Sequence, residues 1–308
     1  MFSSKDGKDF LNVIGYGALM GILNNYEVIN PFISATNDAF NRLKPGFEAP
    51  VCTVTSMGHS VEAPSRNRTV LAGLIREAGN PLATRFELRS PNPNSNTYLV
   101  IAASYMAMLD GIRAAVNAGK TPADLEKSIS KKKGEEDFYL ETGREYRSEK
   151  DVFAHYTPEE RDDIFGRPPE TVWENITAFD KYPEKLEIFK SGGVMTDIVL
   201  ESYKEAIVNQ WATELYNRII PNAMDTVRNC RRLHNESATD YDIGMWAQIS
   251  AQRDKIAKNT MNEFCILKKI SDALDRADYN LASQLQLEAQ REIRKLIDMY
   301  SSYKRNLL

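Results

Sequence analysis

Residues 85–93 have the sequence RFELRSPNP and form the centre of the most informative region of the chain. Arg85, Glu87 and Arg89 alternate with apolar residues, so on a β-strand the three charged side chains share one face. Many charged strand faces are simply solvated. The same arrangement also occurs in polyanion sites, where a carboxylate binds a metal ion and arginines bind phosphate or carboxylate groups. Spacing alone leaves both interpretations open.

Five motifs follow one another in a fixed order along the chain. They are RLKPGFEAP at 42–50, SRNRT at 65–69, RFELRSPNPNSNTYL at 85–99, AASYMAMLDGI at 102–112 and FKSGGVMTD at 189–197. Together they resemble the C-terminal half of the glutamine synthetase catalytic domain, and the resemblance covers about residues 1–212. Several motifs in the right order are far more specific than one short pattern.

The resemblance implies an α+β fold in which antiparallel strands are flanked by helices, followed by a mostly helical region that ends in a helical hairpin. We expect three parts. Residues 1–118 would form a partial catalytic domain, residues 119–212 a charged insert with the closing helical segment of that domain, and residues 213–308 a helical extension.

Three residues are assigned to the glutamate site by the resemblance. Arg42 and Arg89 match arginines that bind the substrate glutamate, and Glu48 lies on the flap over the reacting centre. A carboxylate on a flap can shield an acyl phosphate from water and take a proton from ammonium. Without the resemblance, an exposed loop glutamate is the simpler interpretation of Glu48.

Further residues are assigned to the nucleotide and metal sites in the same way. Arg68 matches the arginine that contacts phosphoryl groups and stabilises negative charge during their transfer, while its neighbour Arg66 receives no role. Arg85 would lie near the nucleotide, and Glu87 would bind Mg²⁺ or Mn²⁺. The implied cofactors are therefore ATP and one of these divalent ions.

The sequence also departs from the family pattern. A second arginine is expected about five residues after Arg68, where this chain has Gly73 and Leu74, and Arg76 comes slightly later. The family's metal-binding His-x-His pair would precede Met1, and none of the three histidines of the chain forms such a pair. We therefore expect part of the active site to lie outside these 308 residues.

Composition excludes several protein classes. The net charge of -4 and the pI near 5.6 argue against a general nucleic-acid-binding protein. We expect no membrane span, because no run of about 18 apolar residues occurs. Three widely spaced cysteines and a polar N-terminus without the apolar stretch of a secretory signal predict reduced thiols in a cytoplasmic protein.

Helical periodicity is clearest in three regions. Residues 9–25 have apolar helical spacing with glycines that would permit close packing on a neighbouring helix, and residues 97–117 form a second helix. Residues 240–305 predict a hairpin of two helices whose apolar stripe packs on its own protein or, alternatively, on a partner. The charged insert at 119–170 carries no recognisable chemistry.

Two classes of function remain. The resemblance implies a ligase of glutamine biosynthesis and nitrogen metabolism, in which glutamate, ATP and ammonia form glutamine through γ-glutamyl phosphate, in a homo-oligomer. A γ-glutamyl-amine ligase is a close variant. The alternative is a non-catalytic fragment or partner subunit that acts through its helical hairpin.

Overall fold

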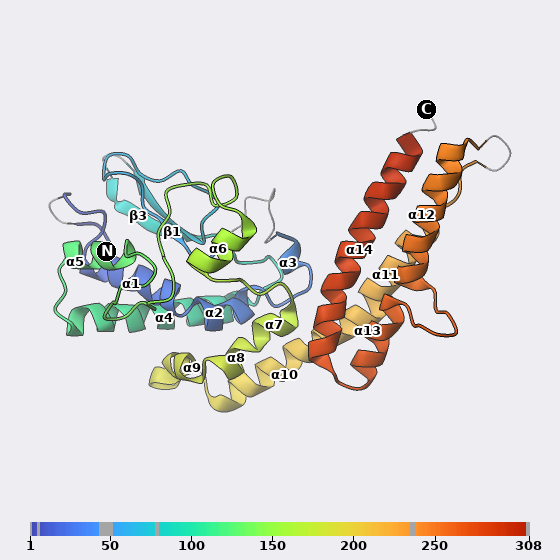
Figure 1. Cartoon of the computed structure of the whole chain (residues 1–308). Helices are drawn as coiled ribbons and strands as arrows, with labels where there is room; N and C mark the ends of the chain where they lie inside the picture. Colours follow the sequence, from blue (N-terminus) through green and yellow to red (C-terminus); the bar gives the residue numbers. More distant parts are fainter. Residues whose placement is uncertain (1, 5–6, 43–51, 78–79, 235–237, 306–308) are drawn as a thin grey trace. The chain divides into compact units, whose positions relative to one another are not determined.

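The computed structural model describes residues 2–4, 7–42, 52–77, 80–234 and 238–305, except for the side chains of Arg42 and Pro81 (Figure 1). The chain divides into two compact units, Met1–Ile207 and Val208–Leu308. Each unit has its own apolar core, so each is described by itself.

The first unit is built on two helices whose backbones lie in contact, α1 (Val13–Asn24) and α4 (Thr97–Asn117) (Figure 1). A Cβ atom on Gly21 would lie 2.0 Å from the carbonyl oxygen of Ala107, and one on Gly111 would lie 2.2 Å from that of Gly17. Only glycine fits at such a close approach. The predicted helix over 97–117 and the packing role of the α1 glycines are therefore confirmed.

An apolar core surrounds α1. Short helices α2 (Tyr26–Ile33) and α3 (Ala39–Arg42) follow it, and α2 also contacts α4. Burying each large apolar side chain stabilises the fold by roughly 1.5–3 kcal/mol. The fully buried members of this cluster include Leu11, Tyr16, Leu19, Met20, Leu23, Met57, Leu71 and Leu74.

The sheet has three strands in the order β1 (Thr55–Ser56), β2 (Ala72–Glu77) and β3 (Asn80–Leu88). β2 pairs with β3 antiparallel, but β1 pairs with β2 parallel. The α+β class is confirmed, whereas the sheet is mixed instead of wholly antiparallel. β1 is short because the Val54 N–H bonds to the Cys52 carbonyl (2.9 Å) within its own segment and not to a neighbouring strand.

The two faces of β3 differ as the alternation predicted. Phe86 and Leu88 pack against the core cluster, while the side chains of Arg85 and Glu87 are more than half exposed. The register pairs Glu87 with Gly73, which has no side chain to cover it. The charged face of the strand therefore remains open at Arg85 and Glu87, but not at Arg89 beyond its end, which is 11% exposed.

Five further helices complete the first unit. Thr121 and Thr157 each form a capping box that starts a helix with proline in its first turn. The helices are α5 (Pro122–Ile129), α6 (Pro158–Phe165), α7 (Val172–Ile176), α8 (Ala178–Lys181) and α9 (Pro183–Lys190), and a 3₁₀ turn follows at Ser191–Gly193.

The second unit is helical and differs from the predicted hairpin. The first of the two predicted helices is broken, because the Cys265 N–H bonds to the Asn259 side chain (3.0 Å) and Thr260 bonds to the backbone of Glu263. Most of the apolar stripe, including Ile249 and Leu296, is buried within this unit, so packing on its own protein is confirmed, although Ile243 and Phe264 are half exposed. The elements are α10 (Asp197–Glu214), which begins in the first unit, a π-helical turn (Leu215–Ile219), α11 (Ile220–Asn229), α12 (Asp240–Ala257), α13 (Ile266–Asp275) and α14 (Tyr279–Arg305).

By length and composition alone, α4 is the one helix among the described residues that could cross a membrane. Core helices of soluble proteins meet the same criterion. Asp110 within α4 accepts a hydrogen bond from the hydroxyl of Tyr139 (2.6 Å), and α4 packs on α1 through backbone contact. These contacts favour a helix packed in a folded unit.

Candidate functional site

Two of the predicted site residues cannot be placed. Glu48 lies outside the described residues, and so does the side chain of Arg42, whose backbone ends α3. The roles predicted for them stay predictions. The other predicted residues lie on or beside β3 and on the loop before β2.

The loop before β2 presents two arginines to solvent, and we call residues 58–69 the arginine loop. It starts at Gly58, whose φ of +105° is a conformation that favours glycine, and a Cβ there would lie 2.3 Å from the Ala63 carbonyl oxygen. Near its end, the Asn67 side chain accepts hydrogen bonds from the backbone N–H (2.9 Å) and hydroxyl (2.7 Å) of Thr69. Arg66 and Arg68 are exposed on either side of Asn67.

Arg89 connects β3 to the arginine loop. Its Nη1 donates a hydrogen bond to the carbonyl of Asn67 (2.9 Å), and its Nε lies 3.1 Å from a carboxylate oxygen of Glu87. The Arg89 side chain is only 11% exposed. The structure thus brings Arg89, Glu87 and the arginine loop together. Arg85 does not join them, because it pairs with Glu77 (3.3 Å).

A cavity of about 580 Å³ lies along the arginine loop. This volume is within the range typical of sites for small molecules. The exposed guanidinium groups of Arg66 and Arg68 make the loop side of the cavity cationic, and the insert contributes Glu149 and Asp151. The full lining is Gly58, His59, Ala63, Pro64, Ser65, Arg66, Asn67, Arg68, Thr69, Glu149 and Asp151.

Glu149 holds the start of the arginine loop. Its carboxylate accepts hydrogen bonds from the backbone N–H groups of Met57 (3.1 Å) and Gly58 (2.9 Å), from Arg147 Nε (2.9 Å) and from the Ser56 hydroxyl. Burial raises the pKa of Glu149, but the hydrogen bonds from Ser56 and Arg147 outweigh it and leave the pKa below its usual range. The group therefore remains ionised at neutral pH.

The residues after Glu149 hold the end of the loop. Asn67 Nδ2 donates to the carbonyl of Lys150 (2.7 Å), and the N–H of Val152 donates to the Thr69 hydroxyl (3.0 Å). The sequence of this insert indicates no chemistry, so these positioning residues could not be predicted from it. The only available signal was an alternation of charges at Arg147 and Glu149, which is too common in solvated segments to identify a site.

The residues that the structure describes do not by themselves make a metal site. The side chain of Glu87 is 53% exposed and its carboxylate is paired with Arg89. In the parts of the chain that the structure describes, no three His, Cys, Asp or Glu side chains are grouped as metal ligands. A single carboxylate cannot satisfy Mg²⁺, which needs near-octahedral oxygen coordination.

The part of the chain that carries the arginine loop and β3 is similar to known glutamine synthetases. Residues 1–143 match the family model described as "Glutamine synthetase, catalytic domain". The chain is 29% identical over 208 residues to the glutamine synthetase of Methylococcus capsulatus, covering 65% of this chain and 36% of that protein. It is 35% identical over 127 residues to the enzyme of Azotobacter vinelandii, covering 39% and 25%.

The chain thus spans about a third or less of the length of these two relatives. A solved structure of Plasmodium falciparum glutamine synthetase aligns with a TM-score of 0.47 and 17% identity, covering 80% of this chain and 44% of that one. The Glu149 segment lies beyond the part that matches the family model. Residues 1–143, which carry the arginine loop and β3, are thus similar to the glutamine synthetase catalytic domain.

Proposed function

We propose that this chain contributes the phosphate-contacting arginine loop of an ATP-dependent glutamate–ammonia ligase. The observation that carries the proposal is the contact between Arg89 and the loop. A largely buried guanidinium group is hydrogen-bonded to Asn67, between the two exposed arginines. Arg89, which we propose for the glutamate site, is thereby bonded to the loop that carries Arg68.

In the proposed reaction, a γ-carboxylate oxygen of glutamate attacks the γ-phosphorus of ATP. The bond from that phosphorus to the bridging oxygen of ADP breaks, and γ-glutamyl phosphate forms. Ammonia then attacks the acyl carbon and releases phosphate. Negative charge spreads over the phosphoryl oxygens during the transfer, so guanidinium groups such as Arg68 stabilise the transition state by position and charge.

Arg89 is suited to hold a glutamate carboxylate while it positions the loop. Two of its nitrogens are engaged, by Asn67 and by Glu87. The third, Nη2, lies over Gly73, where a Cβ atom would be 3.1 Å away. Glycine at this position leaves room for the guanidinium group itself. The bond from Arg89 to the loop that carries Arg68 supports a substrate-binding role for Arg89 and a phosphoryl-contacting role for Arg68.

The whole protein is proposed to be a cytoplasmic homo-oligomer that uses Mg²⁺ or Mn²⁺. Glu87 can give at most one ligand to such an ion, so the remaining ligands would come from residues outside the described set. The alternative of a partner subunit acting through an apolar hairpin stripe has lost its main support. Most of that stripe is buried within its own unit.

Nucleotide binding by the 308-residue chain tests the proposal. ATP, ADP and adenosine are titrated at constant ionic strength, with and without Mg²⁺, against the wild type and Arg68→Ala. The matched control is Arg228→Ala, which removes an exposed arginine of the second unit.

We expect ATP to bind more tightly than adenosine, and Arg68→Ala to reduce that preference by about tenfold, the effect of losing one charged hydrogen bond. Equal affinity for ATP and adenosine, or equal effects of the two substitutions, would contradict the proposal.

A further inference from the structure

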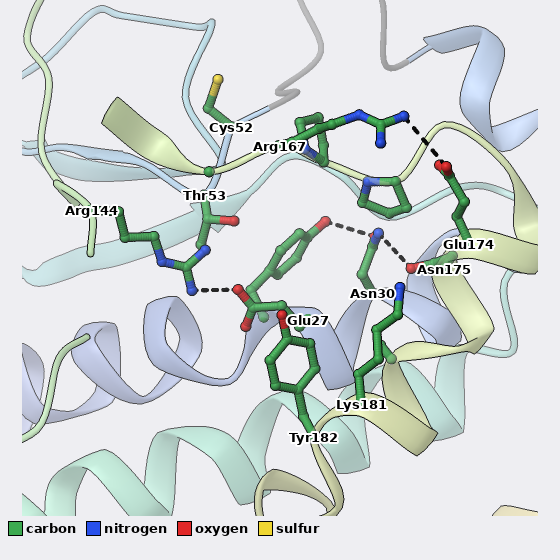
Figure 2. Close-up of a pocket in the computed structure, with 15 residues that line it drawn as sticks. Glu27, Asn30, Cys52, Thr53, Arg144, Arg167, Glu174, Asn175, Lys181 and Tyr182 are labelled. Carbon is green, nitrogen blue, oxygen red and sulfur yellow. Dashed lines mark hydrogen bonds and ion pairs between the residues drawn. The ribbon is translucent and has the colours of Figure 1, made fainter. Parts of the chain in front are cut away.

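A second cavity lies in the first unit and shares no lining residue with that of the arginine loop (Figure 2). Its volume is about 220 Å³. It lies between α2, the segment after Gly166 and the helices α7 and α8. The lining residues are Tyr26, Glu27, Asn30, Cys52, Thr53, Arg144, Gly166, Arg167, Pro168, Pro169, Glu174, Asn175, Ala178, Lys181 and Tyr182.

Both carboxylates in the wall are already engaged by protein groups. One oxygen of Glu27 accepts from Arg144 and the other lies 3.2 Å from Lys185 Nζ. One oxygen of Glu174 accepts from the N–H of Glu170 (2.8 Å), and the other accepts from Arg167 (3.4 Å). A cationic ligand would therefore meet no free carboxylate.

The cations of the wall keep unused donors. Lys181 extends from α8 toward the cavity, and its ammonium group has no hydrogen bond or ion pair within the described part of the chain (Figure 2). Arg144 binds Glu27 through Nη2 and the Tyr146 hydroxyl through Nε (3.0 Å), which leaves Nη1 beside Gly166. An anion would satisfy these donors.

A fixed polar wall faces the same space. The Tyr26 hydroxyl donates to Asn30 Oδ1 (2.9 Å), Asn30 Nδ2 donates to Asn175 Oδ1 (2.8 Å), and Asn175 Nδ2 donates to the carbonyl of Ser34 (3.1 Å). Both asparagines are 2% exposed. An amide nitrogen has two N–H groups, so Asn30 keeps one donor in a side chain that is already held in place.

The remaining lining is apolar or neutral. Pro168, Pro169 and Ala178 provide an aliphatic surface, and burial raises the pKa of Cys52 to about 12, so its thiol is uncharged at neutral pH. The volume is below the roughly 300 Å³ at which pockets for drug-sized ligands begin. The cavity therefore suits a small ligand with one charged group and a short apolar body.

We propose that this cavity binds a small organic anion, whose carboxylate or phosphate group pairs with Lys181 and whose body lies against Pro168 and Pro169. The carboxylates of Glu27 and Glu174 are already paired and so do not attract a cation, whereas the unused donors of Lys181 and Arg144 favour an oxyanion. The site is separate from the proposed ligase reaction, since it uses none of the residues of the arginine loop or β3.

Calorimetric titration of the 308-residue chain tests the site. The probes are benzoate, acetate and inorganic phosphate, with choline as the cationic control, all at constant ionic strength. The variants are Lys181→Met and Lys127→Met, which remove the same charge, the latter from an exposed position on α5 outside the cavity. Arg68→Ala reports binding at the arginine loop.

We expect saturable binding of benzoate or phosphate and none of choline. Lys181→Met should weaken the binding by about tenfold or more, as expected for one charge-assisted hydrogen bond, with Lys127→Met within about twofold of the wild type. Whichever probe binds with the higher affinity, the carboxylate or the phosphate, identifies the charged group of the ligand. Absence of saturable binding, binding unaffected by Lys181→Met, or binding that Arg68→Ala abolishes would overturn the proposal.

Discussion

The most informative perturbation of the arginine loop is Glu149→Ala. The side chains of Glu149 and Arg147 are 16% and 17% exposed, so the substitution removes the nearer of the two carboxylates that pair with a mostly buried guanidinium and leaves only Glu126, at 3.3 Å. It also leaves the N–H groups of Met57 and Gly58 without their acceptor. Breaking a buried ion pair by removing one partner costs about 3–5 kcal/mol. Because water can enter this partly open site, we expect the free energy of unfolding to fall by about 3 kcal/mol, the lower end of that range.

Two measurements check that magnitude. Calorimetry should show the Tm of the first unit falling by about 6–12 °C, from roughly 2–4 °C per kcal/mol for a unit of this size. Hydrogen exchange should become faster across residues 56–69 and stay unchanged in α12 and α14. The matched control is Glu205→Ala, at an exposed position of α10. A Tm within about 2 °C of the wild type, or exchange that is unchanged in the loop, would refute the positioning role of Glu149.

Four further predictions follow from the same structure. Gly21→Val should prevent stable folding of the first unit, because its Cβ would lie 2.0 Å from a carbonyl oxygen of α4; a soluble variant with wild-type melting would contradict this close packing. Glu27→Gln should lower the free energy of unfolding by about 3–5 kcal/mol in urea titrations, because Arg144 and Lys185 lose a buried counter-charge; a change below about 1 kcal/mol would show that the two cations do not depend on it. In the whole protein, Arg89→Ala should raise the KM for glutamate more than the KM for ATP, and equal increases would argue against its carboxylate-binding role. Because the pKa of Glu149 is lowered, its ionised form stabilises the fold above the ordinary glutamate pKa of about 4.3, and this contribution is lost as pH falls below that value. Glu149→Gln should therefore reduce the loss of stability at acid pH, and an unchanged loss would contradict the lowered pKa.

Local sequence rules predicted the parts of the fold that depend on neighbouring residues. The span of α4, the capping boxes at Thr121 and Thr157 and the two faces of β3 all follow from periodicity and capping chemistry. The glycines of α1 also predicted close packing on a neighbouring helix, but the identity of that neighbour, α4, came from the structure. The parallel pairing of β1 with β2 could not be predicted, because no local sequence pattern specifies which strands are neighbours in a sheet.

The candidate site was predicted only in part for the same reason. Family motifs identified Arg68, Glu87 and Arg89, and the structure adds that Arg89 is bonded to the loop that carries Arg68. Glu149 was missed because it lies about 90 residues from the groups that it holds, in a segment whose charges look like a solvated surface. The break between α12 and α13 was missed because side-chain bonds to the backbone, not periodicity, determine it.

The central claim is that the arginine loop acts on phosphoryl groups in an ATP-dependent ligase. The most direct test is glutamine formation from glutamate, ATP and ammonium by the protein as isolated from its source, compared with the same protein carrying Arg68→Ala. We expect ATP-dependent glutamine formation that falls by about 100-fold or more in the variant, as when one group that stabilises transition-state charge is removed, with unchanged Tm. Full activity of the variant, or no ATP-dependent γ-glutamyl bond formation with ammonium or any primary amine, would contradict the claim.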